Sequence, residues 1–215
     1  MAKTRGKSKI FLEDIRAGMP EQREKNLPCE EVVCLYFEQP GPKNTEMTLK
    51  RAARRAEELG VQNIVVASSS GETGLKAVRH FPQKNLIVVT HSTGFSKPNY
   101  QELKPDCRRK LEAAGAKILT CQHSFGGVGR AIRKKLGTYK LEEIMAFTLR
   151  IFGQGTKVAI EIALMAADAG LIASAEPCIA IGGTDGGADT AILLKPANAQ
   201  AFFDLKIMEI LAKPR

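Results

Sequence analysis

The sequence of 215 residues contains no tryptophan and only three tyrosines, and its aromatic content is 6%. Proteins that bind single-stranded nucleic acids stack bases on aromatic side chains, and those that read duplexes carry recognisable reading helices. Neither signature is present in this sequence, so the net charge of +9 does not predict a nucleic-acid partner. A basic protein attracts small anionic molecules equally well, and we expect a ligand of that class.

Cysteine is also scarce, with five residues at irregular spacing and no C-x-x-C pair. This pattern speaks against a disulfide framework and favours a reducing compartment, so we expect a cytoplasmic protein. Cys121 and His123 could offer two metal ligands, but the sequence has no second pair at the spacing of a zinc site. We therefore predict no metal centre.

Long apolar stretches are missing as well. No run reaches the roughly 20 residues that cross a bilayer, and the basic N-terminus is not followed by the apolar core of a signal peptide. The sequence thus predicts no membrane partner. Residues 1–28 are polar and are expected to form an N-terminal arm or extension, while residues 29–215 are expected to form one domain. Whether the chain forms a homo-oligomer is left open.

One stretch organises the rest of the chain. The apolar residues 64–67 predict a buried strand, and Glu72–His80 predicts a helix. Between them stand three serines and Gly71, and Thr73 follows. Hydroxyl groups beside the unpaired N–H groups of a helix start form an anion site, and a glycine lets a ligand approach the backbone. Serines that only cap the helix are the competing interpretation, but one serine would suffice for a cap.

Strands and helices alternate along the first two thirds of the chain. Such alternation predicts parallel βαβ units, whose post-strand loops meet at one edge of the sheet, where ligands bind in open α/β folds. The unusually long loop after the third strand is expected to have a function. The predicted strands are 32–37, 64–67, 86–90 and 117–121, and the predicted helices are 45–59, 72–80, 105–114, 127–136 and 141–152.

A nearly all-apolar helix is expected next. Thr156 is predicted to cap it after a break at residues 153–155, and Ala169 is predicted to be its last residue. Its apolar residues face all directions, which predicts burial. We expect Glu161, its lone interior charge, to pair with Lys157 one turn earlier.

The C-terminal segment predicts a hairpin followed by a helix. Two apolar runs, 178–181 and 189–194, flank a turn that contains four glycines, which predicts one antiparallel strand in the sheet. Residues 202–211 are expected to form a closing helix.

Several short motifs resemble the stand-alone proteins of the pyruvate kinase α/β domain family. In chain order they are Asn44-Thr45-Glu46, Val65-Val66-Ala67-Ser68-Ser69-Ser70-Gly71, Val89-Thr90-His91, Phe152-Gly153-Gln154-Gly155-Thr156-Lys157 and Ala188-Asp189-Thr190. The resemblance runs from about residue 32 to the C-terminus. It implies a three-layer α/β/α sandwich with a mostly parallel sheet and one antiparallel strand, like the C-terminal domain of pyruvate kinase.

The same resemblance implies ligands. In pyruvate kinase a similar Ser/Thr-rich loop holds a phosphate of the allosteric effector fructose bisphosphate, and members of the stand-alone family are associated with flavin mononucleotide. The catalytic barrel of pyruvate kinase has no counterpart in this sequence, so we expect no phosphotransfer from phosphoenolpyruvate to ADP. Asp185 stands in the turn where the family pattern suggests a basic residue, which weakens a phosphate role for that turn.

Three functions are therefore open. The favoured hypothesis is a protein that binds flavin mononucleotide, which includes a flavin-dependent oxidoreductase. The alternatives are a non-enzymatic regulatory module that senses a sugar phosphate or other anionic metabolite, and a structural role with a vestigial site. No catalytic residue is assigned. The expected cofactor-binding residues are Asn44, Ser68, Ser69, Ser70, Gly71, Glu72, Thr73, Thr90, His91, Thr93, Gly94, Phe95, His123, Gly153, Gln154, Gly155, Thr156, Lys157, Gly183 and Thr184.

Overall fold

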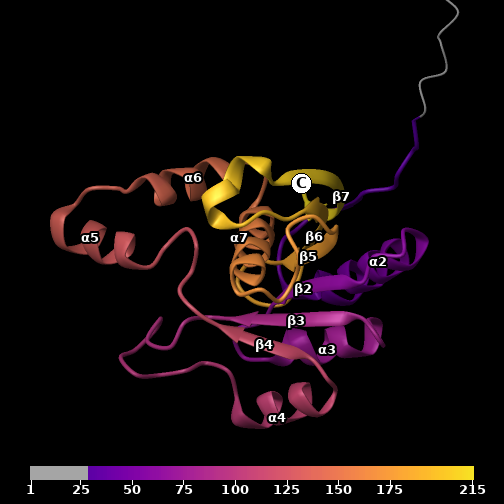
Figure 1. The fold of residues 1–215 in the computed structure, drawn as a ribbon, viewed down its shortest axis with the longest axis horizontal. Helices are drawn as coiled ribbons and strands as arrows, with labels where there is room; N and C mark the ends of the chain where they lie inside the picture. The colour runs from indigo at the N-terminus through magenta and orange to yellow at the C-terminus, as the bar shows by residue number, and fades with distance from the viewer. Residues whose placement is uncertain (1–28) are drawn as a thin grey trace, which may run out of the picture. The chain divides into compact units, whose positions relative to one another are not determined.

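A seven-stranded sheet runs through the part of the chain that the computed structural model describes, residues 29–215 (Figure 1). The arm expected at residues 1–28 lies outside the described residues. The strands are β1 (Leu35–Phe37), β2 (Asn63–Ala67), β3 (Asn85–Thr90), β4 (Lys117–Thr120), β5 (Cys178–Gly182), β6 (Thr190–Lys195) and β7 (Lys206–Pro214). The helices are α2 (Thr45–Glu58), α3 (Glu72–His80), α4 (Pro105–Ala113), α5 (Val128–Leu136), α6 (Leu141–Arg150) and α7 (Gln154–Asp168), with short 3₁₀ helices η1 (Pro42–Asn44) and η2 (Ala199–Asp204).

The strand order confirms the predicted α/β architecture. The order is β1-β7-β6-β5-β2-β3-β4, and β6 is antiparallel to both of its neighbours while the other pairs are parallel. The hairpin between β5 and β6 is the one that the two apolar runs predicted. The carboxyl ends of β2, β3, β4 and β5 therefore meet at one edge of the sheet, as expected.

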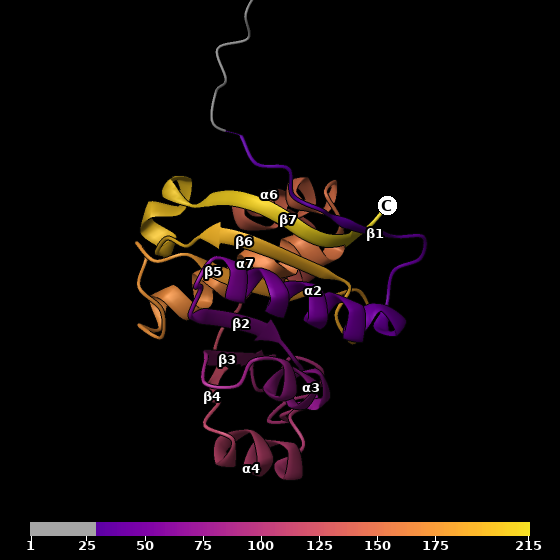
Figure 2. The ribbon, with the colours of Figure 1, turned by 90° about the vertical axis from the view of Figure 1, so that its right-hand side faces the viewer.

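Helices cover both faces of the sheet, which makes the predicted three layers. Ile64 and Val66 of β2 pack with α2, α3 and α4 on one face, and Val65 packs with α7 on the other. Figure 2 shows α2 and α3 in front of the strands and α7 behind them. Because β2 is covered on both faces, its run of apolar residues shows no alternation, as is typical of a central parallel strand.

The closing helix predicted at residues 202–211 is wrong. That segment ends η2 and then forms β7, which inserts between β1 and β6. Ile210 packs with the cluster on the α7 face, and the neighbouring Leu211 packs with the cluster on the α2 face. Successive side chains that point to opposite faces define a strand, and the pairing partners that impose this conformation are distant in sequence.

Most predicted boundaries hold to within two residues, and the first strand and the start of α7 differ in ways that matter. The first strand, expected at 32–37, is shortened to Leu35–Phe37. Helix α7 begins at Gln154 rather than at a Thr156 cap, and the hydroxyl of Thr156 instead donates to the backbone oxygen of Phe152 at 3.1 Å. The burial of α7 on nearly all sides is confirmed, since twelve of its residues are buried.

Large apolar side chains remain exposed along α6 and the residues that follow it. Leu141, Ile144, Phe147, Ile151 and Phe152 are each about half exposed or more. Isolated surface apolar residues are ordinary, whereas apolar residues that recur every three or four positions along a helix are typical of a contact surface. No helix among the described residues is long and apolar enough to span a membrane.

A partly buried ion pair joins α2 to β7. The guanidinium of Arg55, whose side chain is 5% exposed, contacts both carboxylate oxygens of Glu209 at 2.7 and 2.8 Å. Planar guanidinium groups match carboxylates in this two-point geometry, which fixes direction as well as distance. The contact therefore holds the last strand in register against the helix layer.

We predict that Arg55→Met lowers the free energy of unfolding by roughly 1–3 kcal/mol, because Glu209 loses its partner in a partly buried place. Urea denaturation would measure the change. The matched control is Arg54→Met, since Arg54 lies on the same helix, pairs with Glu58 and is 78% exposed. Equal midpoints for the two variants would contradict this role of Arg55.

Candidate functional site

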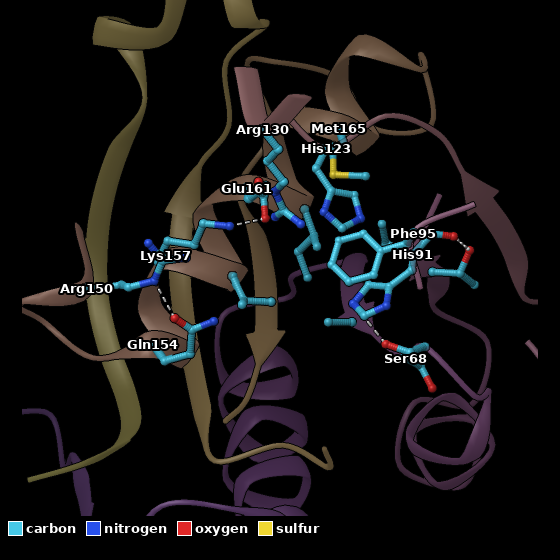
Figure 3. Close-up of a pocket in the computed structure, with 16 residues that line it drawn as sticks. Ser68, His91, Phe95, His123, Arg130, Arg150, Gln154, Lys157, Glu161 and Met165 are labelled. Atoms are coloured by element: carbon cyan, nitrogen blue, oxygen red, sulfur yellow. Dashed lines mark hydrogen bonds and ion pairs between the residues drawn. The ribbon is translucent and has the colours of Figure 1, made fainter. Parts of the chain in front are cut away.

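A pocket lies at the carboxyl edge of β2 and β3, between that edge and the start of α7 (Figure 3). Its volume is about 130 Å³. Of the cofactor-binding residues that the sequence predicted, eight line it: Ser68, Ser69, Thr90, His91, Phe95, His123, Gln154 and Lys157. The others in the lining are Ala67, Val89, Arg130, Arg150, Val158, Glu161, Ile162 and Met165. The prediction that loops after successive strands meet here is therefore supported by the geometry.

The remaining predicted residues lie elsewhere on the same edge. They fall in η1, at the start of α3, in the loop after β3, at the start of α7 and in the β5–β6 turn, and they do not line this pocket. They are Asn44, Ser70, Gly71, Glu72, Thr73, Thr93, Gly94, Gly153, Gly155, Thr156, Gly183 and Thr184. Asn44, for example, uses its side-chain amide to donate to the backbone oxygen of Gln39 at 2.7 Å.

The three serines of the turn after β2 have different partners. The hydroxyl oxygen of Ser68 accepts from the N–H of Gly74 at 3.1 Å, and that of Ser70 accepts from the N–H of Glu72 at 3.4 Å. Both contacts occupy N–H groups in the first turn of α3, whose N-cap residue is Gly71. Ser69 is placed differently, because its hydroxyl lies 3.2 Å from Nε2 of His91. In this one turn, Ser68 and Ser70 therefore contact the start of α3, whereas the hydroxyl of Ser69 contacts His91.

Gly71 has a packing role that the sequence did not reveal. Its φ is +94°, and a Cβ there would lie 2.5 Å from Cβ of Cys107 and 2.7 Å from Cδ1 of Leu103. The glycine is thus required by the chain that leads into α4, which closes over the start of α3. The space beside it belongs to protein atoms, and a larger residue would disturb that packing before it met a ligand.

The turn after β5 is organised by a buried carboxylate. Asp189 is fully buried, and its Oδ2 accepts from the N–H groups of Gly41 at 2.9 Å and Thr184 at 3.2 Å. A Cβ on Gly155 would lie 2.8 Å from Oδ1 of Asp189 and 2.1 Å from Oγ1 of Thr190. These residues bring the start of α7 against β6, so Gly155 and Thr184 serve the framework of this edge.

Lys157 and Glu161 form the ion pair that the sequence predicted, and the structure places it inside the pocket wall. Their side chains are only 4% and 5% exposed. The second carboxylate oxygen of Glu161 accepts from the N–H of Phe125 at 3.0 Å. One carboxylate therefore joins α7 to the segment after β4, which carries His123.

Three rings form the opposite wall. The rings of His91 and Phe95 stack with centroids 4.1 Å apart, and the ring of His123 lies 5.3 Å from the first and 5.1 Å from the second. The guanidinium of Arg130 lies 4.8 Å from the Phe95 ring, a cation–π distance. Figure 3 shows these rings on one side of the pocket and Lys157 with Glu161 on the other.

The environment changes the ionisation of two of these groups. Burial lowers the pKa of His123 to about 4, and nearby Glu161 only partly offsets this. Burial also lowers the pKa of the Lys157 amine, against the attraction of Glu161. His123 is therefore a neutral imidazole at pH 7, and the Lys157 amine keeps the Glu161 carboxylate as its partner.

Two arginines at the pocket were not among the residues that the sequence predicted. Arg130 comes from α5 and Arg150 from the end of α6, where its Nε donates to Oε1 of Gln154 at 2.7 Å. Neither forms an ion pair within the described part of the chain. Their only signal in the sequence was the general excess of basic residues, because both lie on helices rather than in the post-strand loops. Across residues 29–215, no cluster of three histidine, cysteine or acidic residues has metal-binding geometry.

The chain matches a family model and solved structures of known proteins. The family model described as pyruvate kinase, alpha/beta domain, matches residues 46–194. A crystal structure of Cryptosporidium parvum pyruvate kinase is 15% identical and covers 87% of this chain, with a TM-score of 0.37. C. parvum pyruvate kinase in complex with ADP is 16% identical and covers 94%, with a TM-score of 0.36. The matched part is 26% of either solved chain, so this chain corresponds to about a quarter of their length.

We predict that His123 makes the protein less stable in mild acid. Its folded-state pKa of about 4 lies below the ordinary value of 6.5, so the unfolded chain binds more protons between these values. The stabilising contribution of His123 is fully present above pH 6.5 and is lost as the pH falls toward 4. Urea titrations at pH 7 and pH 5 would measure how far the free energy of unfolding falls between these pH values. This fall should be about 1 kcal/mol smaller in His123→Phe than in the wild type, after allowance for solvent screening. Identical losses in wild type and variant would contradict it, and His80→Gln, at a surface histidine, is the control.

Proposed function

Because this chain belongs to the pyruvate kinase alpha/beta domain family, we propose that it binds a small phosphorylated ligand in the pocket at the carboxyl edge of β2 and β3. Flavin mononucleotide is the first candidate, and a sugar phosphate is the second. The pocket, rather than the start of α3 alone, is the site that we assign.

The observation that carries this proposal is the charge of the pocket lining. Arg130, Arg150 and Lys157 face one carboxylate, Glu161, and that carboxylate is occupied by Lys157. Two guanidinium groups thus remain without a carboxylate in the described part of the chain. Arginine forks hold phosphate oxygens in pairs, and charge-assisted bonds in a recessed site are strong.

Hydroxyl groups complete the environment that a phosphate needs. Ser68 and Ser69 line the pocket just before the start of α3. A serine whose oxygen accepts a capping hydrogen bond still has its O–H to donate, so the Ser68 cap does not prevent a phosphate contact. Helix α3 begins shortly after these serines, and the first N–H groups of a helix carry a positive potential.

The residues present fit the two ends of flavin mononucleotide unequally. The cations and hydroxyls suit its phosphate, and the ring of His91, on which Phe95 stacks in this structure, offers a flat face for the flavin ring once Phe95 has moved. The cavity of about 130 Å³ is smaller than the roughly 300–1,000 Å³ of pockets that enclose drug-sized ligands. Phe95, which is 40% exposed, would have to turn outward to admit the ring.

The same volume is the observation in favour of a sugar phosphate. A small anion can use the arginines and hydroxyls without moving the aromatic wall, and such a ligand fits a regulatory module that performs no chemistry. Flavin binding and sugar-phosphate binding share the phosphate contacts, so variants at the arginines test both, and the choice of ligand separates them.

We predict that Arg130→Gln and Arg150→Gln each raise the Kd for the bound phosphate compound about 10-fold or more, because each removes a charge-assisted hydrogen bond. Calorimetric titrations at low salt would compare flavin mononucleotide, riboflavin, glucose 6-phosphate and inorganic phosphate. Riboflavin, which lacks the phosphate, should bind more weakly than flavin mononucleotide.

Arg109→Gln is the matched control, since Arg109 is 73% exposed on α4 and pairs with Asp106. Its affinity for every ligand should equal that of the wild type. Binding that is insensitive to both pocket arginines would contradict the site, and binding of none of the phosphate compounds would contradict the function. Binding of glucose 6-phosphate without binding of flavin mononucleotide would select the sensor.

A further inference from the structure

Three side chains beside the pocket form a continuous row of hydrogen bonds. Oε2 of Glu102 lies 2.6 Å from Nδ1 of His91, and Nε2 of His91 lies 3.2 Å from Oγ of Ser69. We propose that Ser69 is a nucleophile and His91 its general base, held in position by Glu102, and that the chain hydrolyses a carboxylic ester. This activity goes beyond phosphate binding and does not depend on it, because the row consists of protein groups alone.

The order of the contacts gives His91 the tautomer that a base needs. A carboxylate at Nδ1 accepts a proton there, which leaves the lone pair of Nε2 to face the Ser69 hydroxyl. Serine is a weak nucleophile alone and becomes reactive when an oriented imidazole can take its proton. Geometry and roles, rather than sequence order, identify such a triad.

The capping role does not account for Ser69. Its two neighbours, Ser68 and Ser70, already accept the N–H groups at the start of α3. Ser69 is the one hydroxyl of the turn that faces the imidazole. Both Ser69 and His91 line the pocket, so a substrate held there can reach them.

The segment that carries the base is held by its own hydrogen bonds. The side-chain amide of Gln101 donates to the backbone oxygen of His91 at 3.1 Å, and the N–H of Leu103 donates to the side-chain oxygen of Gln101 at 2.9 Å. Glu102 lies between these two residues, and Leu103 is buried. The backbone that carries Glu102 is therefore held on both sides, and its carboxylate contacts Nδ1 of His91.

The two backbone N–H groups that follow Ser69 are the donors that we assign to a developing oxyanion. The backbone N–H groups of Ser70 and Gly71 follow Ser69 directly, and neither has a hydrogen-bond partner among the described residues. In acyl transfer, the N–H after the nucleophile is a common member of the group that stabilises the tetrahedral intermediate. The positive end of α3 favours the same charge.

The reaction balances with water as the only co-reactant. Oγ of Ser69 forms a bond to the ester carbonyl carbon while its proton moves to Nε2 of His91. That proton then passes to the leaving alcohol oxygen as its bond to the carbonyl carbon breaks. The oxygen of water then forms a bond to the carbonyl carbon of the acyl-serine while one water proton moves to His91. The bond between that carbon and Oγ of Ser69 breaks as His91 returns the proton to Oγ, which releases the acid.

The pocket indicates the class of ester. Arg130, Arg150 and Lys157 outnumber the single carboxylate Glu161 in the lining, so a substrate with a negative charge is favoured over a neutral one. The small cavity favours a short acyl chain. We therefore assign short esters that carry a carboxylate or a phosphate.

The test uses p-nitrophenyl acetate and the singly esterified p-nitrophenyl succinate with the full chain. Both should release p-nitrophenolate faster than buffer does, with the larger kcat/KM for the anionic ester. Ser69→Ala and His91→Gln should each lower kcat about 100-fold or more, as the loss of nucleophile or base requires. Glu102→Gln should lower kcat with KM unchanged and should alter the pH profile, because it acts through His91.

Two matched controls keep the native rate. Ser96→Ala changes an exposed serine on the same loop, and His80→Gln changes a histidine that has a glutamate partner, Glu46 at 2.9 Å, and no serine contact. A fluorophosphonate probe should add its mass to the peptide that contains Ser69 in the wild type. This labelling tests the nucleophile even if Ser69→Ala does not fold.

Absence of both turnover and labelling at Ser69 would overturn the proposal. So would turnover that survives in a folded Ser69→Ala protein, since surface histidines alone can cleave activated esters slowly. Equal kcat/KM for the neutral and anionic esters would overturn the substrate class. None of these results bears on phosphate affinity, which the arginine variants measure separately.

Discussion

Glu161 holds the two halves of the candidate site together. It is 4% exposed, and its oxygens contact the Lys157 amine and the N–H of Phe125. A buried carboxylate that lost either partner would carry an unpaired charge or an unfilled acceptor, both of which cost stability. The helix α7 and the segment after β4 must therefore keep their mutual positions. Gly182 at the end of β5 lets the start of α7 pack closely against the sheet, because a Cβ there would lie 2.5 Å from the backbone oxygen of Gly155.

This arrangement explains why the pocket is cationic although its central pair is neutral. Lys157 and Glu161 balance one another, and His123 is neutral at pH 7 because burial lowers its pKa to about 4. What remains is the charge of Arg130 and Arg150, supplied by the helices that follow β4. Charge of this kind attracts an anion most strongly in a recess that excludes water, since the effective dielectric constant is lower there. The excess of basic residues in the sequence indicates a particular binding site only because the fold brings Arg130 and Arg150 to this pocket.

The sequence predicts those parts of the fold that depend on the pattern of neighbouring residues. Apolar runs between turns located β2 through β6, and the rule for parallel strands located the edge where loops meet. The residues that it misread depend on distant partners. Ile210 and Leu211 become a strand because β1 and β6 flank them, Gly71 is required by Cys107, and Arg130 reaches the pocket from a helix. Spacing along the chain does not reveal contacts between residues that are distant in sequence. The motifs therefore predicted the turn after β2 but not which of its serines contacts α3 and which contacts His91.

The loop after β3 connects the two proposed activities, because it supplies both the aromatic wall and the base. Phe95 stacks on His91 at 4.1 Å, and His91 in turn contacts Ser69 at 3.2 Å. A flavin ring that displaced Phe95 would remove the ring that supports the imidazole and would occupy the space in front of Ser69. A small anion held by Arg130 would leave that stack intact. Flavin binding and ester hydrolysis would therefore exclude one another in one pocket, whereas recognition of a small phosphorylated ester would be compatible with hydrolysis.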